Sequence, residues 1–239
     1  MPQRKGAIKV SRAISAAAIG LFLLAEPIAV RADNVEVFAG AQADFANYVY
    51  AGATVALPGQ SIGNGFAFRG YFDTGGYDYM RHDLGLVRAN FTGGELDAVY
   101  GVTLKHIWND VGVGVNATYT GLSPYDPKNY LGGHQTELRV SLDGGTAGGR
   151  WRADWLGYYG TRLYDYDWSL DVTHAVSPNW RLGAVYAFEG NPSYHLDQVG
   201  PFAGLSFGTR SELQLSAGEA WQSGFTPRAY GTAAFFRRF

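Results

Sequence analysis

The sequence predicts an all-β fold, namely an antiparallel outer-membrane β-barrel of about twelve strands. Three observations lead to this prediction: an N-terminal segment with the features of a secretory signal, repeated segments in which apolar and polar side chains alternate, and a strand-like final stretch, Arg228 to Phe239, that ends in an aromatic residue. A barrel suits a membrane because lipid cannot satisfy the hydrogen bonds of an open sheet edge.

The N-terminal segment combines basic residues with an apolar run from Ala13 to Ala25, and its basic residues are Arg4, Lys5, Lys9 and Arg12. Small or modest residues at Val30 and Ala32 suit a signal peptidase, so cleavage is expected after Ala32. The alternative is a retained anchor, but the run is shorter than the ~20 residues that a spanning helix needs. We therefore expect a cleaved signal peptide at 1–32 and one barrel domain at 33–239.

The amino-acid composition limits the kinds of active site and partner that the protein can have. It has no Cys, which excludes a thiolate nucleophile and a Cys-ligated metal, and its net charge of -2 gives no reason to expect nucleic acid as a partner. The 33 Gly and 16 Tyr residues suit strand bends and membrane-interface girdles. We expect no cofactor and no metal.

Because apolar and polar residues alternate with period 2, each predicted strand has one apolar face and one polar face. Leu96 and Tyr100, for example, share a face opposite Asp97. The clearest segments are Glu95 to Lys105, Val111 to Thr120, Glu137 to Asp143, Asp165 to Thr173 and Trp180 to Glu189. A soluble β-sandwich also alternates. The barrel is favoured because the polar faces carry charges of both signs, as a lumen does, while the apolar faces end in Trp or Tyr.

The turn signals give twelve strands if Gly65 to Tyr79 is one long strand and Met80 to Thr92 is mostly loop. Gly93-Gly94 is interpreted as a turn in this count. A further hairpin within Leu84 to Phe91 would raise the count to fourteen.

Twelve strands and a periplasmic N-terminus sort the connections by side. Met80 to Thr92, Ser123 to Gly133 and Gly190 to Gln198 then fall on the outer side as longer loops, while Asn109-Asp110 and Gly208-Thr209 form short periplasmic turns. Even strand numbers and this asymmetry of loop length are typical of bacterial barrels.

The final stretch predicts an assembly signal at the barrel seam. Phe235 and Phe239 share one face with Gly231 and Ala233, and Phe236 lies on the other. A soluble protein that happens to end in Phe remains the alternative for this segment.

Hydrolase chemistry has no local signature in the sequence. The five histidines are not part of a GxSxG or HExxH motif. Because a triad is defined by geometry, His134 or His195 near Ser123 or Ser193 at the outer rim remains an alternative to a histidine that meets headgroups or solvent.

Charged and aromatic residues predict a polar lumen. One group combines acids on one strand face with charges on the strand before: Asp165, Asp167, Asp171, Arg152, Asp154 and Arg162. Cross-strand pairing makes a salt-bridged lining the first interpretation and a metal or glycosidase site the second. Tyr48, Tyr50 and Tyr158 are placed inward, where aromatic rings can stack on sugars; an interface belt is the alternative.

One loop carries a resemblance to a known family. In Ser123-Pro124-Tyr125-Asp126-Pro127-Lys128-Asn129, Asp126 and Asn129 can each cap their own turn. The loop follows Val37-Phe38-Ala39-Gly40 and Ala56-Leu57-Pro58-Gly59, and Val199-Gly200-Pro201-Phe202 comes later. In this order the chain resembles the cellulose biosynthesis protein BcsS family of Gram-negative bacteria, over most of the mature chain.

The resemblance implies a barrel in the cell outer membrane that accompanies a cellulose synthase system and acts in secretion or surface handling of the glucan. Its implied partners are outer-membrane lipid, the cellulose chain and cellulose synthase or secretion subunits. It carries over no catalytic residue. The candidate contact with glucan or a partner is the loop, through Ser123, Pro124, Asp126, Pro127 and Asn129.

The sequence therefore favours a non-enzymatic outer-membrane protein assisting cellulose biosynthesis, export or surface organisation. The alternatives are an outer-membrane hydrolase acting on lipid A or phospholipid, and a small pore or adhesin. A twelve-stranded lumen is narrow, which argues against this barrel being the sole conduit for a glucan.

Overall fold

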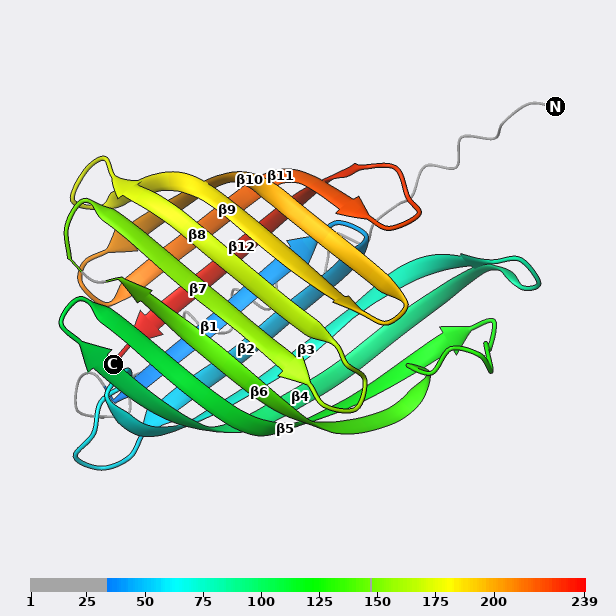
Figure 1. Ribbon diagram of the computed structural model, residues 1–239, viewed down its shortest axis with the longest axis horizontal. Helices are drawn as coiled ribbons and strands as arrows, with labels where there is room; N and C mark the ends of the chain where they lie inside the picture. Colours follow the sequence, from blue (N-terminus) through cyan, green and yellow to red (C-terminus); the bar gives the residue numbers. More distant parts are fainter. Residues whose placement is uncertain (1–33, 147) are drawn as a thin grey trace.

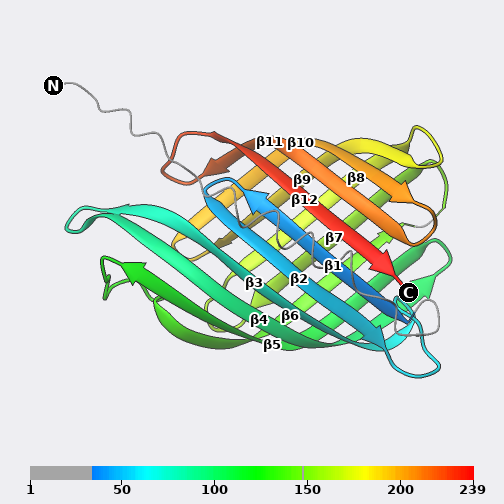
Figure 2. The same ribbon diagram turned by 180° about the vertical axis from the view of Figure 1, so that it is seen from behind.

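The computed structural model describes residues 34–146 and 148–239, so the predicted signal peptide at 1–32 lies outside the described residues. The described chain forms a closed barrel of twelve antiparallel strands, in which each strand pairs with its sequence neighbours and β12 pairs with β1 (Figures 1 and 2). The strands are β1 (Val35–Ala43), β2 (Ala46–Ala56), β3 (Gly65–Arg81), β4 (Gly85–Leu104), β5 (Ile107–Ser123), β6 (Gly133–Thr146), β7 (Trp151–Gly160), β8 (Tyr166–Ala175), β9 (Trp180–Asn191), β10 (Tyr194–Phe207), β11 (Ser211–Gln222) and β12 (Arg228–Arg238). The predicted strand number and fold class are confirmed. Within the described part of the chain, no helix has the length and apolar character needed to cross a membrane.

Alternation along the strands separates an apolar outer face from a polar lumen. On β4, Leu96 is 64% exposed while the adjacent Asp97 is 1% exposed. The outward faces of the other strands carry exposed Val, Leu, Phe, Tyr and Trp side chains in the same way. A band of exposed apolar side chains on a strand face suits contact with lipid, and Trp180 lies at the periplasmic end of β9, as a girdle residue does.

The wall of the barrel is uneven in height. Strands β3, β4 and β5 have 17, 20 and 17 residues, whereas β7 and β8 have 10 each. The β3–β4 and β5–β6 hairpins therefore extend beyond the rest of the barrel at one end (Figure 1). We assign this end to the cell exterior, because outer connections of bacterial barrels are the longer ones.

The long β3–β4 hairpin corrects the expectation that Met80 to Thr92 is mostly loop. The two strands pair as far as Arg81 and Gly85. The alternation of Tyr77, Tyr79 and Arg81 continues the pattern of the strand below. Beyond Phe72, toward the cell exterior, the outward positions of β3 include Thr74 and Asp78, with Met80 at the tip, and we place this end of the hairpin beyond the hydrocarbon layer. A fourteen-stranded barrel is excluded, because 85–91 belongs to β4.

Two predicted turns are also wrong. Gly93-Gly94 lies inside β4, where an added Cβ on Gly93 would stand 2.7 Å from the Thr118 hydroxyl and 2.8 Å from an Asp73 carboxylate oxygen. The glycine makes room for neighbouring side chains. Asn109-Asp110 is paired with β6, and the periplasmic turn comes earlier, at Lys105 and His106.

The outer connection expected at 190–198 is also shorter, since β9 and β10 occupy most of that range. The turn at Gly208-Thr209 lies between β10 and β11, as predicted.

The barrel closes between β1 and β12. Phe235 lies opposite Ala39, and the amide of Phe239 donates to the carbonyl of Val35 at 2.8 Å. Phe235 and Phe239 lie on the outward face, while Phe236 packs inward on Phe38 with ring centroids 6.4 Å apart. The two residues stand where an assembly signal is expected, and that role stays a prediction.

Candidate functional site

Ion pairs lie inside the lumen, along the wall formed by β4 to β7. Arg139 on β6 contacts Glu95 on β4 at 3.0 Å and Glu137 at 3.2 Å, and it also pairs with Asp165 after β7. Its guanidinium lies 4.3 Å from the ring centroid of Tyr158, within cation–π range. Arg139 thereby connects side chains of β4, β6 and the segment after β7.

Two further arginine clusters lie toward the periplasmic side. Arg69 contacts Asp97 at 3.0 Å and pairs with Asp143 across the two intervening strands. Arg181 on β9 lies 3.5 Å from Asp154 and pairs with Glu212 on β11. Charged side chains thus fill parts of the lumen by pairing with strands two or three positions away around the barrel.

The predicted salt-bridged lining is confirmed in part. Asp165 pairs with Arg139, and Arg152 contacts Asp154 at 2.6 Å. Arg162 instead donates from the outer turn to the carbonyl of Thr136 at 3.3 Å. Among residues 34–146 and 148–239, no group of three or more His, Asp or Glu residues is arranged to hold a metal ion.

Tyrosines and carboxylates line the outer half of the lumen, above the Arg139 cluster. Tyr48 and Tyr50 on β2 have ring centroids 6.2 Å apart. The Tyr48 hydroxyl donates to Gln42 Oε1 at 3.1 Å, and on the far side of the barrel Tyr158 of β7, Asp167 of β8 and Glu189 of β9 are neighbours in register. The inward placement of Tyr48, Tyr50 and Tyr158 is therefore confirmed. We call Tyr48, Tyr50, Tyr158, Asp167 and Glu189 the mouth cluster.

The β5–β6 loop is fixed to the end of β3 through Asp126, which is 2% exposed. Its carboxylate accepts from the Tyr79 hydroxyl at 2.9 Å and from the Lys128 amide at 2.9 Å, and it pairs with Arg81. Burial raises the pKa of this carboxyl, but these donors together lower the pKa below its ordinary value. The carboxylate is thus held in its charged form.

Asn129 completes the connection between the loop and β3. Its side-chain amide donates to the Tyr79 hydroxyl at 2.9 Å, and its carbonyl accepts from the Leu131 amide at 2.9 Å. The predicted self-capping of both turns is confirmed, since Asp126 and Asn129 each accept an amide two residues on. The hydrogen-bonding groups of both side chains are used inside the protein.

With this geometry established, comparison with known proteins identifies the family. The sequence matches the family described as cellulose biosynthesis protein BcsS over residues 36–239. The chain belongs to the BcsS family. The matched region covers all twelve strands of the BcsS barrel and the β5–β6 loop.

The BcsS barrel also resembles solved outer-membrane proteins of Gram-negative bacteria. The KdgM porin is 8% identical, with a TM-score of 0.48, over 85% of this chain and 99% of its own. The COG4313 outer membrane channel from Pseudomonas putida F1 is 12% identical, with a TM-score of 0.48, over 90% and 100%. The β domain of the Bordetella autotransporter BrkA is 14% identical, with a TM-score of 0.46, over 86% and 98%. We draw no functional conclusion from these similarities. No curated protein matches the sequence.

In the β5–β6 loop of this BcsS chain, some side chains face the barrel and others face solvent. Asp126 and Asn129 point toward β3, whereas Ser123, Pro124 and Pro127 are exposed. Contact of these five residues with glucan or a partner stays a prediction. The sequence alone did not identify Tyr79 and Arg81 as the residues that hold the loop. They lie at the border of a segment that was interpreted as loop. Their alternation with period 2 could have shown that the strand continues through them.

Two histidines of the BcsS barrel lie on its outward face near the outer rim. His134 stacks on Tyr119, with ring centroids 4.8 Å apart. The Nε2 atom of His195 lies 2.9 Å from Asp197 Oδ2, and its Nδ1 atom lies 2.9 Å from the Tyr166 hydroxyl. In a Ser-His-Asp triad the nucleophile contacts Nε2 and the carboxylate contacts Nδ1, so here the hydroxyl and the carboxylate lie at the opposite ring nitrogens, and the hydroxyl is a phenol.

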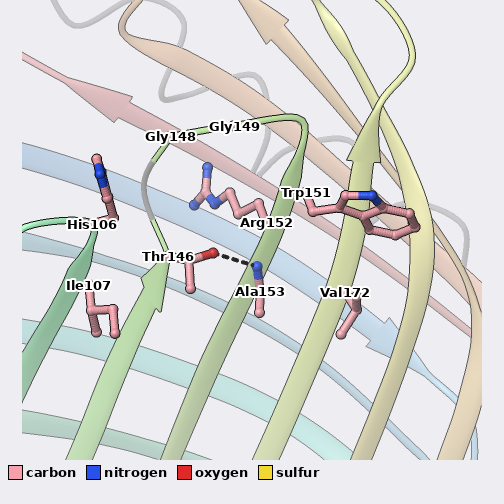
Figure 3. A pocket seen from close by; sticks show the side chains of 9 residues that line it. All are labelled: His106, Ile107, Thr146, Gly148, Gly149, Trp151, Arg152, Ala153 and Val172. Carbon is pink, nitrogen blue, oxygen red and sulfur yellow. Dashed lines mark hydrogen bonds between the residues drawn. The ribbon is translucent and has the colours of Figure 1, made fainter.

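A shallow groove of about 610 Å³ lies on the outward face at the periplasmic end, where β6 and β7 separate (Figure 3). The amide of Ala153 donates there to the Thr146 hydroxyl at 2.9 Å, beyond the last register pair of the two strands. Trp151, Ile107 and Val172 give the groove an apolar lining. This surface faces lipid and is separate from the lumen.

Proposed function

We propose that this BcsS-family barrel is a non-enzymatic protein of the cell outer membrane that assists the export or surface organisation of bacterial cellulose. One observation supports a role at the surface over a role as conduit. The side chains of the Arg139 cluster occupy part of the narrow lumen, while the mouth cluster and the raised β3–β6 wall lie toward the outer side. The glucan is expected to meet the barrel from outside.

The chemistry of the mouth cluster suits a neutral polysaccharide. Pyranose rings present apolar C–H faces that pack on aromatic rings, and their hydroxyls donate to carboxylates such as Asp167 and Glu189. Tyrosine provides an apolar face together with a polar tip. A few polar groups placed among aromatic side chains are the usual composition of a ligand site.

The β5–β6 loop is the second proposed contact. Ser123, Pro124 and Pro127 would touch the glucan or a synthase or secretion subunit directly, and Tyr125 next to them is 74% exposed. Asp126 and Asn129 would act by holding the loop in place. Replacing Tyr125 with Ala is then expected to weaken the contact, whereas replacing it with Phe, which keeps the ring, preserves it.

The experiment that tests the proposal measures cellulose outside the cell and in the periplasm of a clean deletion strain, its parent and a complemented strain. Less cellulose outside, restored by the wild-type gene, is expected. Complementation with Tyr48→Ala and Tyr158→Ala variants at equal barrel levels separates the role of the mouth cluster from that of the barrel as a whole. Unchanged cellulose in every strain would overturn the proposal.

A second candidate function is modification of an outer-membrane lipid. The contacts of His195 with Asp197 and Tyr166 favour it, since a carboxylate, an imidazole and a hydroxyl lie in sequence on the lipid-facing wall. Lipid A and phospholipid profiles that change in both the deletion strain and a His195→Gln strain would support this candidate. Unchanged profiles would remove it.

A further inference from the structure

A groove of about 320 Å³ lies on the outward face of the raised wall, across β3 to β6. It forms around Gly94, which stands opposite Phe72 on β3 and Ala117 on β5. Because Gly94 has no side chain, the lipid-facing surface is hollowed between its neighbours. The groove is also lined by Tyr119, His134 and Thr136.

The groove lies at the height where the apolar band of the wall ends. On β4, the outward positions on the membrane side of Gly94 are apolar and begin with Leu96 and Ala98. The outward positions on the other side are Thr92, Asn90 and Arg88. This change from apolar to polar marks the boundary between hydrocarbon and headgroups in the outer leaflet.

Basic side chains border the groove on its headgroup side. His134 lines it, and the guanidinium of Arg162 donates to the carbonyl of Thr136, another lining residue, at 3.3 Å. Arg88 lies further out on the same face of β4, opposite Asp78 on β3. Arginine suits phosphate because its planar donors match the oxygens of the anion.

We propose that this groove holds an acyl chain of lipid A, the phosphorylated glycolipid of the outer leaflet, with a lipid A phosphate bound by Arg162 and His134. The apolar lining and the height of the groove select an acyl chain at the membrane boundary, and the basic border selects an anionic headgroup. The proposal concerns the lipid-facing surface and is independent of glucan binding in the lumen.

The substitution Gly94→Leu tests the proposal directly, because the leucine side chain would occupy the groove. A Cβ at Gly94 has the Tyr71 carbonyl as its nearest atom, at 3.2 Å, so a small shift accommodates it. Gly70→Leu is the matched control, because Gly70 lies on the same outward face of the neighbouring strand, outside the groove, and its Cβ would meet nothing closer than 3.6 Å. A double variant, His134→Gln with Arg162→Gln, removes the basic border without adding volume. The heat-dependent shift of the folded band on a gel verifies the fold of each variant.

The purified full-length barrels are titrated with lipid A, and with phosphatidylethanolamine and phosphatidylglycerol, in one detergent, and bound lipid is counted by native mass spectrometry. Wild type and Gly70→Leu are expected to bind one lipid A. Gly94→Leu, which fills the groove, and the double variant, which loses the donors to the phosphate, are each expected to bind it at least about tenfold more weakly. Equal binding by all four proteins, or equal affinity of the wild type for the phospholipids, would overturn the proposal. If Gly94→Leu does not fold, the double variant alone decides.

Discussion

Arg81 at the end of β3 and Asp126 in the β5–β6 loop form an ion pair although they are 45 residues apart in the sequence. With the Tyr79 hydroxyl between Asp126 and Asn129, this pair fixes the loop to the raised wall. The loop is therefore a rigid extension of the sheet, and its exposed residues are held at a defined position above the membrane.

Asp126→Asn is expected to free the loop without unfolding the barrel. The substitution removes the charge that pairs with Arg81, while the strand ladders stay intact. Limited proteolysis of the refolded protein should show faster cleavage within 123–133 in the variant, with an unchanged heat-dependent gel shift. Lys128→Gln serves as the control, because only the backbone amide of Lys128 holds Asp126. Equal cleavage of all three proteins would contradict the role given to the ion pair.

The loop should stay fixed until the medium becomes strongly acidic. Its neighbours lower the pKa of Asp126 below the ordinary 3.8, so the stabilisation is complete above 3.8 and is lost as the pH falls through the lower folded value. Pepsin is expected to cut the loop faster at a pH well below 3.8 than just above it. In Asp126→Asn this difference should disappear. A loop that is released already between pH 7 and pH 5 would show that another group controls it.

Arg139→Ala is expected to lower the free energy of unfolding by about 3 kcal/mol, because three carboxylates lose their shared cation in the lumen. Arg152→Ala should cost about 1 kcal/mol or less, since the Arg152 side chain is 38% exposed, against 10% for Arg139. Urea midpoints of both variants in one detergent measure the difference. Equal midpoints would contradict the central position of Arg139.

Arg69→Ala combined with Arg139→Ala is expected to raise the single-channel conductance in planar bilayers, because both side chains occupy space inside the lumen. The wild type should conduct little. Arg88→Ala, on the outward face, should leave the conductance at the wild-type value. A wild-type conductance as high as that of the double variant would show that the arginine clusters leave an open path.

Phe239→Ala is expected to reduce the amount of barrel assembled in the outer membrane severalfold, because the terminal aromatic lies on the lipid-facing side of the closing strand. Phe236→Ala is the matched control, since Phe236 packs inward on Phe38 in the same strand. Comparing the heat-modifiable band in isolated membranes measures assembly. A larger loss with Phe236→Ala would assign the effect to lumen packing.

The sequence predicted the barrel well because period-2 alternation is a local property. The faces of Leu96 and Asp97 follow directly from their positions along one strand. Gly93-Gly94 was misplaced because local composition resembles a turn, and only the side chains of Asp73 and Thr118 on neighbouring strands explain the glycine inside β4. Non-local information of this kind is absent from a single stretch of sequence.

The same limit applied to the candidate site. Asp126 and Asn129 were recognised as turn-capping residues from their spacing, and the structure confirms this. Their contacts with Tyr79 and Arg81 depend on how two hairpins lie beside each other, which no local pattern encodes. The contacts of Arg139 with Glu95 and Asp165 likewise arise only when β4 to β8 are paired in register.

The unequal strand lengths give the molecule a direction within the plane of the membrane. Lipid surrounds the lower wall evenly, so the barrel is free to rotate about its axis, but the raised hairpins stand on one side only. A fibre lying along the surface would meet that side and orient the barrel, and neighbouring copies along one fibre would share the same orientation. A row of barrels along one fibre would then have a common orientation on the cell surface, although each barrel is nearly round in cross-section.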